Sequence, residues 1–197
     1  MDKYKNFDEL NRNEEDDTYS ISYEMGSSGI AIITPHGGGI EPGTSEIVKG
    51  VAGNEHSFYT FDGLKQNNKC LHITSENFDE PNCVELVRQS DRVVAIHGWK
   101  RNDNCLCLGG LDQNLKNKIQ TTLINAGFKV VDCPEVLKGE GKKNICNRNR
   151  DHCGVQIEIS RGLRDRMFEL NTKKGRSKKT PIYHLFVKTL REALNTL

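Results

Sequence analysis

The sequence predicts an α/β fold: a single domain in which helices flank a mixed central β-sheet. Apolar, strand-forming runs alternate along the chain with segments of helical spacing, and this alternation is typical of α/β proteins. The 197 residues are enough for one substantial hydrophobic core but too few for two. No internal repeat is visible, which fits a single unit of this kind.

The first half of the chain is predicted to contain three strands and two helices. Residues 1–20 form a short amphipathic segment and a polar lead-in, and a single domain is expected over 21–197. Apolar and β-branched residues predict strands at about 29–35, 57–61 and 70–74. Helices are expected over 43–52, opened by Thr44, and from Pro81 onward for about nine residues, because proline is tolerated in the first turn of a helix.

The second half continues the alternation and ends in a long helix. Strands are expected at 92–97, 105–108, 128–133 and 154–160. Leucine and isoleucine at helical spacing predict a helix over 111–125, which ends before Gly127, a typical stop signal. Polar residues predict a loop over 134–150. A C-terminal helix is expected over 180–197, with Pro181 in its first turn.

Charge is balanced overall but unevenly distributed. The formal net charge is +1, so no global attraction to nucleic acid or to a membrane is expected. Residues 8–17 are acidic and residues 161–179 are basic. The basic segment is interpreted first as a solvated loop, with an electrostatic funnel for a polyanion as the functional alternative. No apolar run approaches the roughly 18 residues of a membrane span and no signal peptide is visible, so a soluble protein made in the cytosol is expected.

The seven cysteines are predicted to be reduced. Their number is odd and their spacing irregular, whereas a disulfide framework favours an even number in a secreted protein. Cys105 and Cys107 would lie on one face of a strand, but they are not a CxxC pair and no second paired motif follows. Buried thiols are therefore favoured over a cysteine metal site.

The most informative motif lies at the end of the first long strand, where the chain reads TPHGGGIE over 34–41. Three glycines follow the strand and let the backbone turn sharply. His36 and Glu41, held on one tight loop, can converge on a single cation, as such residues do in zinc hydrolases. Taken singly, His36 could instead bond to the backbone, and Glu41 could start a helix, where a carboxylate is favourable.

Two further polar residues lie at or near strand ends. His97 ends the apolar run VVAIHGW, and Glu158 lies within VQIEIS. The carboxyl ends of strands are where α/β folds usually carry their sites. A catalytic zinc needs three protein ligands and an open position for water, and His36, Glu41 and His97 supply such a set. Alternation places Glu158 on the same face as Gln156, where it could take the proton of the water or simply be half-exposed.

These motifs resemble the phage-type poly-γ-glutamate hydrolases, a zinc family whose fold is similar to the carboxypeptidase core. The matching segments, in the family's order, are PHGGGIE (35–41), LHITSENFDEP (71–81), IHGW (96–99), GGLD (109–112), NR (147–148) and GVQIEIS (154–160). They extend from about residue 20 to residue 170. Together they are specific, although any one of them alone would be weak.

The resemblance implies that 21–197 is a single zinc hydrolase domain. It implies that His36, Glu41 and His97 bind the zinc and that Glu158 is the general base. Carboxypeptidases place the first His and Glu closer together, so the wider spacing from His36 to Glu41 favours the smaller family. The glycine-rich insert makes this wider spacing geometrically plausible.

The resemblance also implies roles for arginines and for one more histidine. Arg148 and Arg164 stand where the family pattern has arginine, and a guanidinium fork suits the substrate carboxylates or the developing oxyanion. The alternative for each is a surface salt bridge. His72 would line the cleft, unless it is a structural histidine. Arg161 departs from the family pattern and could tune the reach of the substrate site.

The favoured function is a monomeric, endo-acting zinc hydrolase that cleaves the γ-glutamyl amide bonds of poly-γ-glutamate, without a nucleic-acid or membrane partner. One alternative keeps the zinc and changes the substrate to another γ-linked or acylated amino acid. The other alternative is a polyanion-binding module that uses residues 161–179. That last reading leaves the His and Glu residues at the strand ends unexplained, and no aromatics for base stacking are interleaved with the basic run. The apparent lack of a signal peptide fits an enzyme released by cell lysis.

Overall fold

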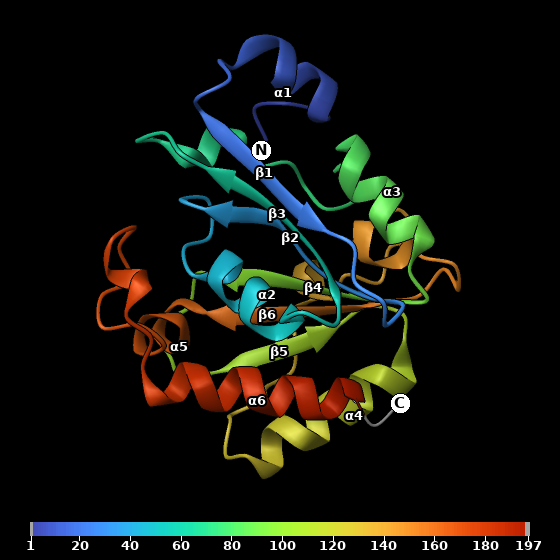
Figure 1. Ribbon diagram of the computed structural model, residues 1–197, viewed down its shortest axis with the longest axis vertical. Helices are drawn as coiled ribbons and strands as arrows, with labels where there is room; N and C mark the ends of the chain where they lie inside the picture. Colours follow the sequence, from blue (N-terminus) through green and yellow to red (C-terminus); the bar gives the residue numbers. More distant parts are fainter. Residues whose placement is uncertain (1, 196–197) are drawn as a thin grey trace.

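A six-stranded mixed sheet forms the centre of the computed structural model, which describes residues 2–195 (Figure 1). Its middle consists of four parallel strands, which are β3 (Ser57–Gly63), β2 (Ile30–Gly38), β4 (Arg92–Trp99) and β6 (Val155–Ser160). The edge strands, β1 (Tyr19–Glu24) and β5 (Leu106–Gly109), are antiparallel to their neighbours. The spatial order is β1-β3-β2-β4-β6-β5. The predicted α/β domain with a mixed central sheet is therefore confirmed.

Helices cover both faces of this sheet (Figure 1). One face packs against α2 (Thr44–Ala52), α4 (Gln113–Asn125), α5 (Arg161–Arg166) and α6 (Pro181–Asn195). The other face packs against α1 (Phe7–Asn13) and α3 (Pro81–Gln89). Four short 3-10 turns lie in the connections, namely η1 (Asn68–Leu71), η2 (Glu135–Leu137), η3 (Ile145–Asn147) and η4 (Gly175–Ser177). None of the helices in the described chain is long and apolar enough to traverse a bilayer.

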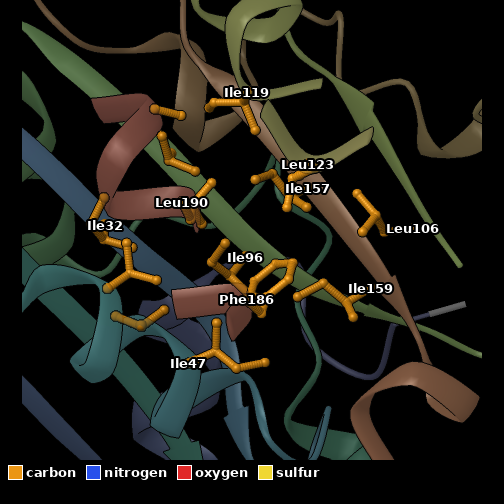
Figure 2. Packing of buried hydrophobic residues seen from close by; sticks show 14 of the residues in the cluster. Ile32, Ile47, Ile96, Leu106, Ile119, Leu123, Ile157, Ile159, Phe186 and Leu190 are labelled. Carbon is orange, nitrogen blue, oxygen red and sulfur yellow. The ribbon is translucent and has the colours of Figure 1, made fainter. Parts of the chain in front are cut away.

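Alternation along the parallel strands divides the apolar side chains between two cores. On β2, Ile32 faces one core and Ile33 the other, because successive side chains of a strand point to opposite faces. In the first core, Ile96 of β4 and Ile159 of β6 lie on either side of Phe186 of α6, as Figure 2 shows. Because the parallel strands are buried on both faces, they appear in the sequence as nearly continuous apolar runs. This is why their positions could be predicted.

The N-terminal segment contributes to the second core. Tyr4 and Leu10 are buried there, and β1 spans the expected boundary between residues 20 and 21. Strand β1 was not predicted from the sequence, because its residues are half-exposed at the sheet edge and carry only a weak apolar signal. Helix α5 was not predicted either, because its six residues include too few apolar ones for a helical stripe.

Two of the predicted strands are wrong. Residues 70–74 do not form a strand: η1 occupies 68–71, and Leu71 and Ile73 are buried within an irregular segment. Their alternation imitates a strand because both side chains enter the second core. Residues 128–133 make only an isolated parallel bridge, between Leu106 and Val130. In the first segment Thr74 N–H donates to the side chain of Asp2, and in the second the backbones of Lys129 and Val131 bond, among residues 2–195, only to Leu106, so neither segment extends a ladder.

The prediction that all cysteines are reduced is also wrong. Cys107 on β5 forms a disulfide with Cys133, which lies just before the segment over 134–141. The bridge between Leu106 and Val130 brings the two cysteines together, and their separation of 26 residues gave no sign of this pairing. The other cysteines are free thiols. In the β5–β6 register, Cys107 lies directly opposite Glu158.

The disulfide is expected to add substantially to stability, because it restricts the unfolded chain. A Cys133→Ser variant should lose about 3 kcal/mol of free energy of unfolding, the size expected when a loop of this length is opened. For a domain of this size, that loss lowers Tm by about 6–12 °C. Calorimetry with and without a reductant measures the difference, and Cys153→Ser, at a half-buried free thiol, is the matched control. Equal Tm values for the wild type and Cys133→Ser would contradict the expectation.

Candidate metal centre

Three neighbouring strands bring their polar residues to one edge of the sheet. His36 lies near the end of β2, His97 near the end of β4, and Glu158 on β6. Since β2, β4 and β6 are adjacent and parallel, their carboxyl ends meet, and His97 is paired directly with Glu158 in the ladder. Helix α2 leaves this edge toward one face of the sheet, whereas α3 covers the other face. Crevices of this kind are the usual binding sites of α/β sheets.

A β-bulge aims the His36 side chain. Between Thr34 and Gly37 the register of β2 with β3 shifts, so that β2 holds one more residue than its partner. Such a bulge bends the strand and redirects its side chains. The strand then turns back, and the backbone N–H of Glu41 donates to the carbonyl of His36 at 2.9 Å. This short return brings the Glu41 carboxylate beside the histidine.

His36, Glu41 and His97 form one compact cluster of potential ligands. Their ligand atoms all lie within 4.8 Å of one another. The Nδ1 atoms of His36 and His97 are 3.1 Å apart. The Glu41 carboxylate lies 3.3 Å from His36 Nδ1 and 3.6 Å from His97 Nδ1. Two imidazole nitrogens and a carboxylate around one point are a donor set that suits zinc.

The outer hydrogen bonds leave the inner nitrogens free to bind a cation. His36 Nε2–H donates to the carbonyl of Ile73 at 2.8 Å, so the Nδ1 of a neutral His36 carries a lone pair. His97 Nε2 lies 3.5 Å from Ser75 Oγ, on the far side of the ring from the cluster. Lone pairs on two nitrogens 3.1 Å apart repel each other unless a cation or a proton lies between them. The residues present therefore fit a metal ion.

Gly98 permits the close approach of Glu41. The Gly98 N–H donates to Glu41 Oε2 at 2.7 Å. A Cβ at this position would lie 2.8 Å from Glu41 Cβ and 2.7 Å from the guanidinium carbon of Arg164. Any larger residue would therefore displace one of these two side chains. The glycine of the IHGW motif is thus required by packing at the metal centre.

The charges of the cluster shift its pKa values in opposite directions. Burial acts to raise the pKa of Glu41, but His36 and His97 outweigh it and hold this pKa below its usual value. Burial acts to lower the pKa of His97, but the hydrogen bond to Glu41 and the nearby carboxylates raise it. Burial raises the pKa of Glu158 to about 7. A pKa in this range suits a group that exchanges a proton near neutral pH.

Arg164 is buried at the edge of the same site. Its guanidinium donates to the backbone carbonyls of Ile159, Pro42 and Trp99, and so connects three segments around the cluster. Burial lowers its pKa to about 10, which leaves it charged at neutral pH. These contacts use three of its five N–H groups, and Arg164 also lies in the wall of the cleft. The surface salt bridge that was considered as the alternative is not what the structure shows.

Arg148 is not brought to the cleft. Its guanidinium donates to the backbone carbonyls of Lys143, Phe78, Ser75 and Glu76. It therefore fixes the irregular segment that carries the outer partners of the metal centre, rather than lining the cleft itself. Burial lowers its pKa.

His72 and Arg161 both line the cleft. The ring of His72 stacks on His36 with centroids 4.0 Å apart, and its Nδ1 is 2.7 Å from Asp2 Oδ1. Burial is the main cause that lowers the pKa of His72. Arg161 is exposed and donates to Asp165 at 2.6 Å. The cleft has a volume of about 1320 Å³, and Glu41, His97 and Glu158 also lie in its wall.

Three basic side chains of the segment 161–179 form ion pairs within the protein. The ion pairs are Arg161–Asp165, Arg176–Glu46 and Lys178–Glu169. Arg176 is buried, so it supports the fold and offers no charge to a polyanion. These pairs involve three of the eight basic side chains of the segment and reduce the positive charge that a polyanion-binding module would use.

Several site residues were not predicted from the sequence. The Ile73 carbonyl and Ser75 hold the outer side of the histidines, although the segment that contains them was among the matching motifs. Residues 134–141 were expected to be a simple polar loop, but they form one wall of the cleft. Gln156 was placed on the correct face by alternation, without a function. None of these roles has a sequence signal, because each depends on contacts between distant segments.

Comparison with known proteins identifies relatives along the whole chain. The family model described as poly-gamma-glutamate hydrolase matches residues 4–189. The SPbeta prophage-derived protein YoqZ of Bacillus subtilis strain 168 is 35% identical over 198 aligned positions, which cover 98% of this chain and 72% of that protein. The protein YmaC of the same strain is 40% identical over 172 positions, which cover 85% of this chain and 73% of that protein.

Two solved structures are similar to the whole domain. A bacteriophage poly-gamma-glutamate hydrolase has a TM-score of 0.95 at 31% identity, covering 100% of this chain and 98% of that one. A zinc-free form of YNDL also has a TM-score of 0.95, at 32% identity, covering 99% of this chain and 98% of that one.

Proposed function

The chain belongs to the poly-gamma-glutamate hydrolase family, and we propose that it is a zinc-dependent enzyme that cleaves γ-glutamyl amide bonds within poly-γ-glutamate. The family makes it a hydrolase. The observation that carries the proposal is the cluster of His36, Glu41 and His97 beside Glu158 in one cleft. This arrangement supplies both a metal site and a buried base at the same strand ends.

Zinc is favoured by the chemistry of the donor set. Two imidazole nitrogens and one carboxylate are a ligand set of catalytic zinc, which keeps a further position open for water. The outer hydrogen bond from His36 to the Ile73 carbonyl is the kind of contact that fixes a ligating histidine in its correct tautomer. A solved relative is described as a zinc-free form, which agrees with this metal.

The other catalytic and substrate-binding roles are assigned to residues that line the cleft. Zinc, when bound, supplies a water of lowered pKa and polarises the scissile carbonyl. Glu158, whose pKa near neutrality suits both steps, takes the proton of that water and returns it to the leaving amine. Arg164 stays charged within the cleft wall, and its two remaining N–H groups are available for an oxyanion or a substrate carboxylate. His72 and Arg161 are assigned to substrate contacts on the same wall.

Arg148 has a different place in this scheme. Four backbone carbonyls occupy its guanidinium, so we assign it to support of the 75–78 segment rather than to the substrate. Through that segment it keeps Ser75 next to His97.

The size of the cleft favours an endo mode of cleavage. Pockets for small ligands measure about 300–1,000 Å³, whereas this cleft measures about 1320 Å³. It can therefore hold several units of a polymer on either side of the metal centre. Each unit of poly-γ-glutamate carries a carboxylate, which the cationic side chains of the cleft wall can pair with.

The proposed function is tested by the chain length of poly-γ-glutamate during incubation with the purified protein. Rapid shortening is expected, because an endo enzyme cuts the polymer internally. A chelator should stop the shortening and added zinc should restore it. An unchanged polymer, in a preparation that contains stoichiometric zinc, would reject this substrate and favour another γ-linked or acylated amino acid.

A further inference from the structure

A buried glutamine joins the proposed base to the wall of the cleft. Gln156 precedes Glu158 by two residues on β6, so both side chains lie on the same face of the sheet. Gln156 Nε2 donates to Glu158 Oε1 at 2.9 Å and to the carbonyl of Leu137 at 3.2 Å. Gln156 Oε1 accepts from Asn144 Nδ2 at 2.9 Å. Gln156 is only 5% exposed, and these contacts use both of its N–H donors and one of the two lone pairs of its oxygen.

The network also fixes which way the Gln156 amide points. Asn144 Oδ1 accepts the backbone N–H of Cys146 at 3.1 Å, so Asn144 must present its NH₂ group to Gln156. Gln156 must then accept with its oxygen on that side and donate with its nitrogen toward Glu158. A flipped amide would place its oxygen against Glu158 Oε1 and the Leu137 carbonyl, and its NH₂ group against the NH₂ group of Asn144. The N–H group that donates to Glu158 is therefore oriented by Asn144 and Cys146, which take no part in the proposed reaction.

Residues 134–141, which form one wall of the cleft, pack directly against Gln156. Residues 134–141 line the cleft, and their backbone is fastened where Gly110 N–H donates to the carbonyl of Lys138 at 2.7 Å. A Cβ at Gly139, whose φ is +61°, would lie 2.8 Å from Gln156 Oε1. Only glycine lets the backbone of the wall approach the amide so closely.

We propose that Gln156 is a positioning residue, which holds Oε1 of Glu158 and thereby leaves Oε2 as the atom that accepts the proton. In residues 2–195, Oε2 receives no hydrogen bond, so the one from Gln156 determines the orientation of the carboxylate. The same Gln156 amide donates to the Leu137 carbonyl in the segment 134–141. One side chain therefore holds both the proposed base and the wall that meets the polymer. This inference rests on the proposed function and deepens the role of Glu158 in it.

Kinetics of Gln156→Met test the proposal. Methionine has a similar length but cannot donate a hydrogen bond, so kcat on poly-γ-glutamate should fall about 10–100-fold, as it does when supporting partners of active-site groups are lost. KM should change less than kcat, since Gln156 also contacts the wall through Leu137, and zinc content should stay within about twofold of the wild type. Gln120→Met, at an exposed position of α4, is the matched control and should leave kcat unchanged. An unchanged kcat for Gln156→Met, or a loss confined to KM, would overturn the proposal.

A second variant tests the same contact with Gln156 still in place. Asn144→Asp keeps the acceptor for the Cys146 N–H but removes the donor to Gln156, so the amide must flip and turn its oxygen toward Glu158. The same loss in kcat is expected. This variant decides the question if Gln156→Met does not fold, and a wild-type kcat would then reject the positioning role.

Crystal structures of the zinc-free variants give a readout that does not depend on activity. The Glu158 carboxylate should leave its wild-type rotamer in both Gln156→Met and Asn144→Asp. An unmoved carboxylate would refute the positioning role even if activity falls. If the wild type itself cleaves no polymer, the proposed function fails, while the rotamer of Glu158 still decides the role of Gln156.

Discussion

Replacing Glu158 by glutamine is expected to lower kcat on poly-γ-glutamate by about 10³-fold, within the range that a general base contributes. Glutamine has the same shape but cannot take the proton of the attacking water. Glu158 lies outside the cluster of three ligand atoms, so zinc content should remain at the wild-type level. The measurement is the initial rate at which new polymer ends appear, together with the metal content of each preparation.

Glu85→Gln is the matched control for this variant. Glu85 is an exposed residue of α3, far from the strand ends, and loses the same charge without any expected effect on the rate. A kcat for Glu158→Gln within a few-fold of the wild type would remove Glu158 from the mechanism. Loss of zinc together with the rate would instead make Glu158 a part of the metal site.

Because the pKa of Glu158 is raised, Glu158→Gln should also change how the free energy of unfolding depends on pH. Burial raises its pKa to about 7 in the folded, zinc-free protein, so the folded state binds the proton more tightly than the unfolded state does. The contribution of Glu158 to the free energy of unfolding is fully present below its pKa in the unfolded chain. It is lost as the pH rises through about 7. Zinc-free Glu158→Gln should lack this part of the decline between about pH 4.5 and 7 when both proteins are unfolded with urea.

Replacing His97 by alanine is expected to abolish metal binding and turnover together. His97 Nδ1 faces His36 Nδ1 and Glu41 across the centre of the cluster, so its loss leaves only two ligands. Zinc affinity should fall by more than about 100-fold, because even the loss of an outer partner costs 10–100-fold. A calorimetric titration with zinc measures the affinity of the variant directly.

Thermal stability provides an independent readout of the same site. Zinc at about 100 times its Kd should stabilise the wild type by about 2.7 kcal/mol, because the ion binds the folded state. The His97→Ala variant should gain almost nothing at the same concentration. His184→Ala, on the exposed face of α6, should respond to zinc as the wild type does. A zinc-dependent rise in Tm that survives His97→Ala would place the metal elsewhere.

The α/β class, the positions of the central strands and the proximity of His36, Glu41 and His97 could all be predicted from the sequence. Strands buried on both faces must be apolar along their whole length, so β2, β4 and β6 are visible as runs in the sequence. Adjacent parallel strands present their carboxyl ends together, which is why His36 and His97 could be expected to meet. These features follow from periodicity and local backbone chemistry, which are properties of short segments.

Contacts between segments that are far apart in the chain could not be predicted in this way and became visible in the folded molecule. Sequence separation conceals the Cys107–Cys133 disulfide, the enclosure of Arg148 by backbone carbonyls and the attachment of residues 134–141 to Gln156. Arg148 and Arg164 look equivalent in the sequence, yet only Arg164 lies in the wall of the cleft. The physical reason is that a hydrogen bond or a disulfide depends on where two segments are placed in space, and that placement is set by the packing of the whole sheet and its helices.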